Sequence, residues 1–300
     1  DGVLVVDKPE GLTSHDVVAA VRRRLPRGTK VGHTGTLDPF ATGVLPVVLG
    51  KATRLSQFLT ADRKQYVADV VFGSATDSGD RTGTVTNTAA ASSLAALDAA
   101  RIGTALATFL GTHPQVPPAY SAKKVDGERA YVLARQGAAV TLEAVEVTAY
   151  ALELVAWDAA RDVARLALTS SAGYYVRSLA RDLGDRVSAP AHLDALRRTA
   201  SGPFTLDRAV PLASVVEGGA DAIAAARLPL AALLPDLPAV PLDAGQVDDV
   251  RHGRPVRLHA GQALPGVERV RLVGPGDTLV ALARPRPGDD SRLHADLVLL

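Results

Sequence analysis

One carboxylate stands out in the segment from 32 to 46, GHTGTLDPFATGVLP, which otherwise holds small, hydroxyl-bearing, apolar and turn-forming residues. Its three glycines, two prolines and three threonines favour a loop that is ordered by its own hydrogen bonds. The nearest acidic residues along the chain, Asp16 and Asp62, are far from Asp38. A rigid loop that presents one acid suits covalent catalysis, in which a carboxylate adduct divides a difficult step into easier ones. The alternative is an Asp38 side chain that only caps the turn before Pro39.

Two further residues carry groups that such chemistry can use. Tyr66 lies in a predicted strand, 64–72, whose alternate residues are apolar, and on pattern alone it is a core-facing aromatic. Arg177 lies in the first turn of a predicted helix, 174–183, which follows a strand and a turn. An arginine at that position opposes the helix dipole, so it requires a carboxylate or phosphate partner.

The elements that must position these residues do not follow a regular order. Apolar spacing and turn residues predict strands at 3–6, 64–72 and 163–169, and a buried stretch at 44–49. The same signals predict a helix that begins at Thr13 or Ser14, and helices at 53–59, 92–110, 127–137, 174–183 and 190–199. Strict alternation of strand and helix is absent. We therefore expect an α+β fold with a mixed or antiparallel sheet.

Composition limits the classes of function. The chain of 300 residues is 47% hydrophobic, enough for one large or two ordinary domains. Cysteine is absent, which excludes disulfides, thiolate catalysis and cysteine metal sites. No apolar run approaches the roughly 18 residues of a membrane span, and no signal peptide is visible, so we expect a cytoplasmic protein without membrane contact.

Charge is unevenly distributed. Net charge is only +1, but residues 1–64 hold ten Lys or Arg against six Asp or Glu. Arginines between 22 and 27, with Lys30, cluster at the end of the first predicted helix. They either compensate the helix dipole or contact phosphates, and the sequence leaves both possibilities open.

A change in composition marks a second domain. Prolines at 229, 235, 238 and 241 separate residues 1–238 from 239–300. Beyond them, short apolar runs are punctuated by glycines, a pattern typical of a small all-β barrel. Arg251 and Arg254 recur at a spacing of three and are candidate phosphate contacts.

The segment from 32 to 46 closely resembles the signature loop of the TruB family of pseudouridine synthases. Every fixed position of the family pattern, Gly-His-Thr-Gly-x-Leu-Asp-Pro-x-Ala-x-Gly-x-Leu-Pro, is met here. Further segments resemble the family in the same order along nearly the whole chain: GVLVVDKP at 2–9, KQY at 64–66, VPPAYSAKK at 116–124, Tyr131 with Ala134-Arg135, and GYYVRS at 173–178. The last 60 residues resemble the small PUA-type RNA-binding barrel of that family.

The resemblance implies isomerisation of one uridine to pseudouridine in the T-loop of tRNA, at position 55. In the family the aspartate of the loop is the nucleophile, which gives Asp38 that role, and Arg177 matches the arginine that pairs with it. Because the target base must be extruded from the folded RNA, Tyr66 matches the aromatic that stacks on it and its hydroxyl can transfer a proton. The reaction needs no cofactor and no metal.

The resemblance also assigns residues that bind the RNA. His33 would fill the space left by the flipped base, and Tyr175 and Leu196 would line the base pocket. Lys8, and Lys123 within an insertion at about 113–137 that closes over the RNA, would contact the nucleic acid. Pattern alone equally allows His33 as a turn residue and Tyr175 as a core aromatic.

Three other functions compete with a stand-alone, monomeric enzyme that acts on the T-loop and T-stem without an obligatory protein partner. A guide-RNA-dependent synthase shares the signature loop but works in a larger complex. An RNA-binding folding factor needs no turnover. A carboxylate glycosidase needs a second positioned acid, and none is near Asp38 in sequence. Pseudouridine analysis of bare tRNA treated with the purified protein separates these alternatives.

Overall fold

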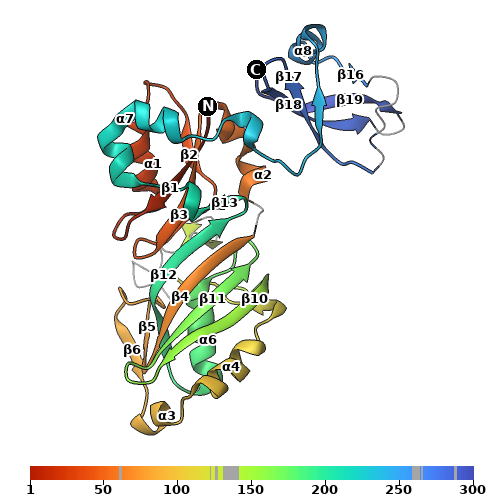
Figure 1. Ribbon diagram of the computed structural model, residues 1–300. Coiled ribbons are helices and arrows are strands. Elements are labelled where there is room, and N and C mark those ends of the chain that lie inside the picture. Colours follow the sequence, from red (N-terminus) through yellow and green to blue (C-terminus); the bar gives the residue numbers. More distant parts are fainter. Residues whose placement is uncertain are drawn as a thin grey trace.

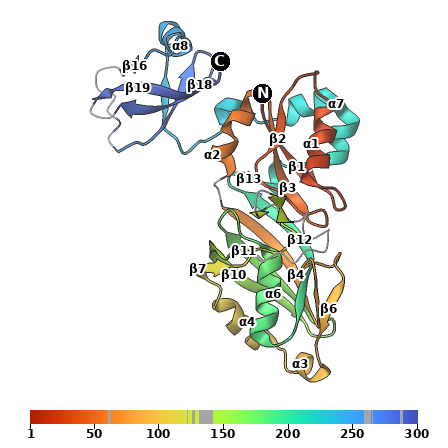
Figure 2. The same ribbon diagram turned by 180° about the vertical axis from the view of Figure 1, so that it is seen from behind.

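The computed structural model describes residues 1–60, 63–121, 123–125, 128–130, 142–258, 264, 266–286 and 289–300. Figure 1 shows a long sheet that runs the length of the larger, N-terminal part of the chain, with helices at both ends, and a smaller sheet set to one side near the C-terminus. The view from behind shows α6 and α4 against one face of the lower half of the long sheet (Figure 2). The expected α+β class is confirmed.

The long sheet has ten strands among the described residues, in the order β14-β1-β3-β12-β4-β11-β10-β7, with β2 on β3 and β13 on β12. Their bounds are β1 Gly2–Lys8, β2 Val31–His33, β3 Thr42–Leu49, β4 Lys64–Phe72, β7 Gly111–Gln115, β10 Val145–Asp158, β11 Val163–Ser170, β12 Ala191–Ser201, β13 Phe204–Thr205 and β14 Val210–Pro211. Only the β1–β14 and β3–β12 pairs are parallel within it, so the sheet is mixed, as expected.

Strand β12 replaces the helix that the sequence analysis placed at 190–199, and that prediction is wrong. Along β12 the buried residues alternate with more exposed ones, apart from a bulge between Leu193 and Ala195. The bulge shifts the alternation by one residue, so the apolar residues recur at a spacing that also fits a helix. Pairing with β3 on one side and β4 on the other decides the conformation.

Two further helix predictions need correction. The single helix expected at 92–110 is two short helices, α3 (Ala91–Ala95) and α4 (Ala99–Ala107). The Asp98 side chain accepts a hydrogen bond from the Arg101 N–H and is the N-cap of the second helix. Of the helix expected at 127–137, residues 128–129 form a short strand and 130 is also described, while the rest lies outside the described residues.

The remaining helices frame the sheet. They are α1 Ser14–Arg22, α2 Ser56–Thr60, α6 Val176–Val187, α7 Leu212–Ala226 and α8 Ala244–Arg251, with short 3-10 turns at Gly50–Leu55, Leu206–Arg208 and Leu230–Ala232. Thr13 caps α1 in a reciprocal capping box with Asp16, as its sequence indicates. Small hairpins pair β5 (Ser74–Thr76) with β6 (Val85–Thr88) and β8 (Lys124–Val125) with β9 (Glu128–Arg129).

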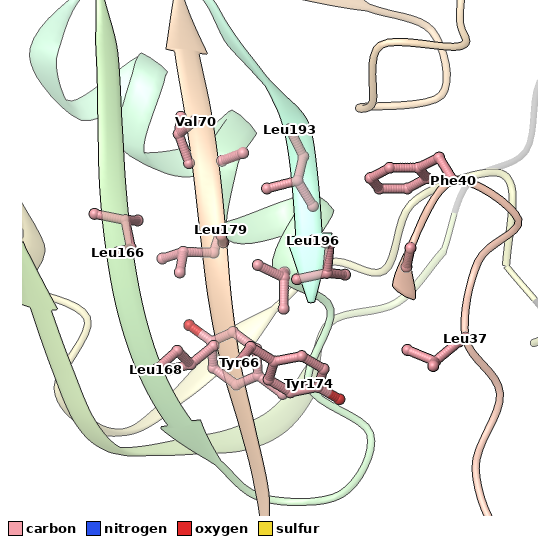
Figure 3. Close-up of a cluster of buried hydrophobic side chains, with 14 of the residues drawn as sticks. Leu37, Phe40, Tyr66, Val70, Leu166, Leu168, Tyr174, Leu179, Leu193 and Leu196 are labelled. Atoms are coloured by element: carbon pink, nitrogen blue, oxygen red, sulfur yellow. The ribbon is translucent and has the colours of Figure 1, made fainter. Parts of the chain in front are cut away.

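The core of the lower half lies between the sheet and α6. Tyr66, Ala68, Val70 and Phe72 share the buried face of β4, as their alternation predicts. Figure 3 shows Tyr66 beside Leu168 of β11 and Leu196 of β12, with Leu179 of α6 across the layer. One end of this apolar layer therefore opens onto the segment that carries Asp38.

The C-terminal residues form a second sheet, in the order β15-β17-β18-β19-β16, with α8 beside it. Its strands are β15 Ala239–Pro241, β16 Val256–Arg257, β17 Val270–Gly274, β18 Thr278–Arg286 and β19 Asp289–Val298. Leu279, Leu282 and Leu299 pack in one cluster with Val3 and Leu55 of the N-terminal part. In the described part of the chain, no helix combines the length and hydropathy of a membrane span.

Candidate active site

A cavity of about 260 Å³ opens where four segments meet: the loop that carries Asp38, strand β4, the N-terminal end of α6, and strand β12. Asp38, Tyr66, Tyr175, Arg177 and Leu196, all predicted site residues, line it. They come from distant parts of the chain, and the mixed sheet brings them together. The volume lies near the lower end of the range for small-ligand sites, about 300–1,000 Å³.

Asp38 and Arg177 form a bidentate ion pair at this cavity. Arg177 Nε donates to Asp38 Oδ2 at 2.8 Å, and Arg177 Nη2 donates to Asp38 Oδ1 at 3.0 Å. The Arg177 side chain is 5% exposed, whereas the Asp38 side chain is 32% exposed. The pair therefore holds the carboxylate in one orientation with one side open to the cavity.

The rest of the Arg177 guanidinium is fixed by backbone carbonyls and a second acid. Nη1 donates to the carbonyl of Ser78 at 2.9 Å, and Nη2 donates to the carbonyl of Tyr120 at 2.9 Å. Asp80 Oδ2 lies 3.8 Å from Nε and is nearly buried. The sequence analysis missed Asp80, whose position in a polar turn gave no sign of a contact across the fold.

Helix α6 reaches this position because its first turn is tied to β7. The backbone N–H of Tyr175 donates to Gln115 Oε1 at 2.8 Å, and Gln115 Nε2 donates to the Tyr175 carbonyl at 3.1 Å. The Ser178 hydroxyl donates to the Val116 carbonyl at 2.7 Å. These bonds satisfy groups at the helix start, where Tyr175 itself makes no side-chain cap.

Tyr66 is nearly buried on β4 with its ring at the cavity wall. Burial raises the pKa of its hydroxyl, and a hydrogen bond and the charge of Arg198 act in the opposite direction. The Tyr66 side chain is therefore a neutral phenol at ordinary pH, which keeps its proton until a stronger proton acceptor lies beside it.

Arg198, on β12 directly opposite Tyr66, is a second residue that the sequence analysis missed as part of the site. It is 1% exposed. Its guanidinium donates to the carbonyls of Gly35, Thr36 and Val44 at 3.0, 3.3 and 2.7 Å. The predicted helix at 190–199 concealed the alternation that points Leu196 and Arg198 to the cavity.

His33 and Lys8 lie beside the loop and not among the described residues that line the cavity. His33 Nδ1 accepts a hydrogen bond from the Gly35 N–H at 3.3 Å, and burial lowers the pKa of its imidazole. Lys8 is fully buried and donates to the carbonyls of Pro9, Leu12 and Pro39. Its ammonium holds the loop from within, a placement that leaves it no access to an RNA phosphate in this conformation.

The remaining predicted contacts are on the surface. Lys123 is exposed near the cavity wall residues Tyr120 and Ser121. Arg251, in α8, and Arg254, just after it, pair with Asp248 and Asp249 at 3.9 and 3.2 Å. Exposed pairs of this kind contribute little stability, about 0–1 kcal/mol, so phosphates can displace the aspartates. In the described part of the chain, no cluster of three or more potential ligand residues could hold a metal ion.

Two family models match consecutive parts of the chain. The model described as "TruB family pseudouridylate synthase (N terminal domain)" matches residues 22–176. The chain belongs to the TruB family. A second model, "tRNA pseudouridylate synthase B C-terminal domain", matches residues 177–234. The family of pseudouridine synthases inferred from the signature loop is thereby confirmed, and the chain is an isomerase.

Curated TruB relatives align along most of the chain. The protein named tRNA pseudouridine synthase B of Solibacter usitatus is 45% identical over 94% of this chain and 94% of its own length. The protein of the same name from Geobacter sulfurreducens is 42% identical over 94% of this chain and 93% of its own. A solved Cbf5-Nop10-Gar1 complex contains a similar chain, 28% identical, with a TM-score of 0.70 over 100% of this chain and 85% of that one.

Proposed function

We propose that this TruB-family enzyme converts the T-loop uridine at position 55 of tRNA to pseudouridine, with Asp38 as the nucleophile on a flipped-out base. The observation that carries the proposal is the half-open Asp38 carboxylate, fixed by buried Arg177 at a cavity that Tyr66, Tyr175 and Leu196 line. The relatives named tRNA pseudouridine synthase B support tRNA as the substrate.

The reaction breaks the N1–C1′ bond of uridine and forms a C5–C1′ bond with the same uracil. The proton on C5 leaves, N1 gains a proton, and no oxidation or group loss occurs. Asp38 forms a covalent adduct with the sugar or the base, and the adduct bond breaks again as the C5–C1′ bond forms. The walls of the cavity keep the uracil in place while it turns. Arg177 aims the carboxylate through two charge-assisted hydrogen bonds.

The cavity fits an extruded base. The ring of Tyr66 can stack on the uracil, Leu196 provides an apolar wall, and Tyr175 closes the opposite side. The Thr34 hydroxyl lines the same cavity, is buried, and has no hydrogen-bond partner among the described residues. It is therefore suited to bond an edge of the base, since a buried hydroxyl without a partner is costly.

The hydroxyl of Tyr66 is the group we assign to proton transfer from C5. It faces the cavity as a neutral phenol, and Arg198 can stabilise charge that develops on its oxygen. His33, at the end of β2, would take the place of the flipped base in the RNA stack.

RNA binding extends beyond the cavity in this proposal. We divide the chain into a catalytic domain, 1–238, and a PUA-like RNA-binding domain, 239–300, in which Arg251 and Arg254 contact phosphates. The insertion at about 113–137, with Lys123, closes over the T-arm. The five-stranded C-terminal sheet supports the barrel-like identity.

We further propose that the enzyme is a monomer that acts alone in the cytoplasm. The fold is shared with the chain in the Cbf5-Nop10-Gar1 complex, and a related solved structure is an H/ACA RNP bound to a substrate RNA. Identity is higher, 42–45%, to the relatives named tRNA pseudouridine synthase B, which favours direct recognition of tRNA.

The test is incubation of the purified protein with an unmodified tRNA transcript, followed by mapping of pseudouridine. We expect modification at position 55 without guide RNA or added protein. A transcript with the T-loop uridine replaced by cytidine is the matched control and should remain unmodified. Modification that appears only with a guide RNA would favour the alternative, and tRNA refolding without pseudouridine would favour a folding factor.

A further inference from the structure

Arg198 makes contacts that have no role in the proposed reaction so far. Its guanidinium bonds three carbonyls that flank Asp38 on both sides in the segment from 32 to 46. The side chain of Arg198 also lies next to Tyr66, because the two residues are directly opposite each other on neighbouring strands and both line the cavity. Arg198 therefore links the loop that carries Asp38 with the aromatic at the base site.

The backbone of Arg198 holds the same loop. It pairs with Gly43 in the short parallel ladder between β12 and β3. Gly43 has φ of +100°, and a Cβ there would lie 2.2 Å from the Arg198 carbonyl oxygen. Only glycine permits this approach. The backbone of Arg198 therefore fixes the C-terminal half of the loop, while its side chain contacts the N-terminal half.

The charge of Arg198 is buried without a carboxylate. The side chain is 1% exposed, and among the described residues no Asp or Glu lies within ion-pair distance of it. Burying a cation in this way is costly, by several kcal/mol per ion, unless its hydrogen bonds are satisfied. Arg197, its neighbour, shows the ordinary solution: it pairs with Asp7 at 2.7 Å and is 42% exposed.

We propose that Arg198 is a positioning residue for the isomerisation, fixing the Tyr66 hydroxyl relative to the loop that carries Asp38. The phenol oxygen accepts a hydrogen bond from the guanidinium, which leaves its O–H free to point into the cavity. The guanidinium also stabilises negative charge on that oxygen when the proton moves. The proposal rests on the role assigned to Tyr66 under the proposed function.

Other charged groups act on Tyr66 from the same cavity. Asp38 opposes loss of the phenol proton, while Arg198 favours it. The ionisable side chains that line the cavity besides these are Lys64, Tyr120, Tyr174, Tyr175 and Arg177. Arg198 is the one that lies directly opposite Tyr66 on the neighbouring strand.

A double-mutant cycle tests the proposal. Single-turnover release of the C5 hydrogen from a tRNA transcript is measured for wild type, Tyr66→Phe, Arg198→Lys and the double variant. We expect Arg198→Lys to slow wild type by about tenfold or more, with unchanged tRNA affinity, and to slow Tyr66→Phe by less than about threefold. Equal slowing in both backgrounds, or full activity of Arg198→Lys, would overturn the proposal. If wild type itself makes no pseudouridine, the proposed function has failed instead.

Spectroscopy of the free protein supplies a readout that a purely structural role would not move. The chain has six tyrosines, so ring-¹³C labelling gives a simple spectrum in which the Tyr66 signal is the one that disappears in Tyr66→Phe. The signal should shift in Arg198→Lys and stay in place in the control, Arg197→Lys. An unshifted signal in a folded Arg198 variant would contradict the contact. Arg198→Gln, which keeps donors for the loop carbonyls, replaces the lysine variant should that one not fold.

Discussion

Gln115 and Tyr175 exchange two hydrogen bonds although 60 residues separate them in the sequence. The side-chain amide of Gln115 pairs with the backbone N–H and C=O of Tyr175, as the backbone of a neighbouring strand would. Gln115 is 2% exposed. Arg177 lies two residues further along the same helix start. Strand β7 is thus joined to the start of the helix that carries the arginine bound to Asp38.

We expect Gln115→Leu to lower both stability and rate. The change leaves the Tyr175 N–H without its partner, at a cost of about 1–3 kcal/mol for a buried group, while the Tyr175 carbonyl keeps its hydrogen bond from the Leu179 N–H. Arg177 then loses its fixed position, so the single-turnover rate should fall by more than tRNA affinity does. Denaturant unfolding and single-turnover assays measure the two effects. Gln65→Leu, at an exposed site on β4, is the matched control and should change neither.

Asp38→Asn should abolish turnover while tRNA affinity stays within about tenfold of wild type. The amide has nearly the same shape but lacks the charge that attacks and that Arg177 binds. Asp7→Asn removes a carboxylate from another arginine pair outside the cavity and should stay active. Pseudouridine formed at a substantial rate by pure Asp38→Asn would remove Asp38 from its role.

Tyr66→Phe should separate stacking from proton transfer. The ring remains to stack on the uracil, so tRNA affinity should stay near wild type. Positioned proton transfer contributes about a hundred- to ten-thousandfold, so the single-turnover rate should fall at least about a hundredfold. Tyr66→Leu should lose affinity and rate together. A nearly active Phe variant beside an impaired Leu variant would leave Tyr66 as a stacking platform only.

Replacing Arg251 and Arg254 together by alanine should weaken tRNA binding more than it slows the bound enzyme. Removing an arginine that neutralises a phosphate reduces the salt dependence of binding, with a change in slope of about one for each such arginine. Titrations at several salt concentrations measure this slope. Arg161→Ala, an exposed arginine between β10 and β11, is the control for loss of surface charge. An unchanged slope in the double variant would place the RNA elsewhere.

Lys8 should make stability depend on pH in the alkaline range. Burial lowers its pKa to about 8, against the opposing charge of Asp38. Between pH 8 and the ordinary lysine value of 10.5, the unfolded chain binds more protons than the folded one. The free energy of unfolding of wild type should therefore rise with pH relative to Lys8→Met across this window and not below it. Urea unfolding at pH 7, 8, 9 and 10 measures the difference.

The sequence predicted the elements whose signals are local. Alternation on β4 placed Tyr66 on a buried face, and Thr13 marked the start of α1. The dipole argument required a carboxylate or phosphate partner for Arg177, and in the structure the carboxylate of Asp38 is that partner. The family motif then identified which acid and which aromatic belong to the site.

What the sequence could not provide are contacts set by tertiary pairing. The bulge in β12 disturbs its alternation, so the pattern alone favours a helix there and hides the place of Arg198. Asp80 meets Arg177 only after the hairpin of β5 and β6 folds back toward α6. Lys8 resembles a surface lysine after a strand, and only the packed loop shows that three carbonyls enclose it.

The two parallel pairings in the long sheet also govern how the nascent protein folds. Val6 of β1 pairs with Val210 of β14, which the ribosome adds about 200 residues later. Strand β12 fills the gap between β3 and β4 from a similarly late position, and contacts of such high sequence separation form slowly. A chain interrupted before residue 191 would leave β3, which follows the loop of Asp38, and β4, which carries Tyr66, each with an open edge, and open edges are sites for aggregation. The segment from 191 to 228 contains β12 and β14, so its synthesis covers the open edges of β1, β3 and β4. We therefore expect the tendency to aggregate to fall once this segment has left the ribosome.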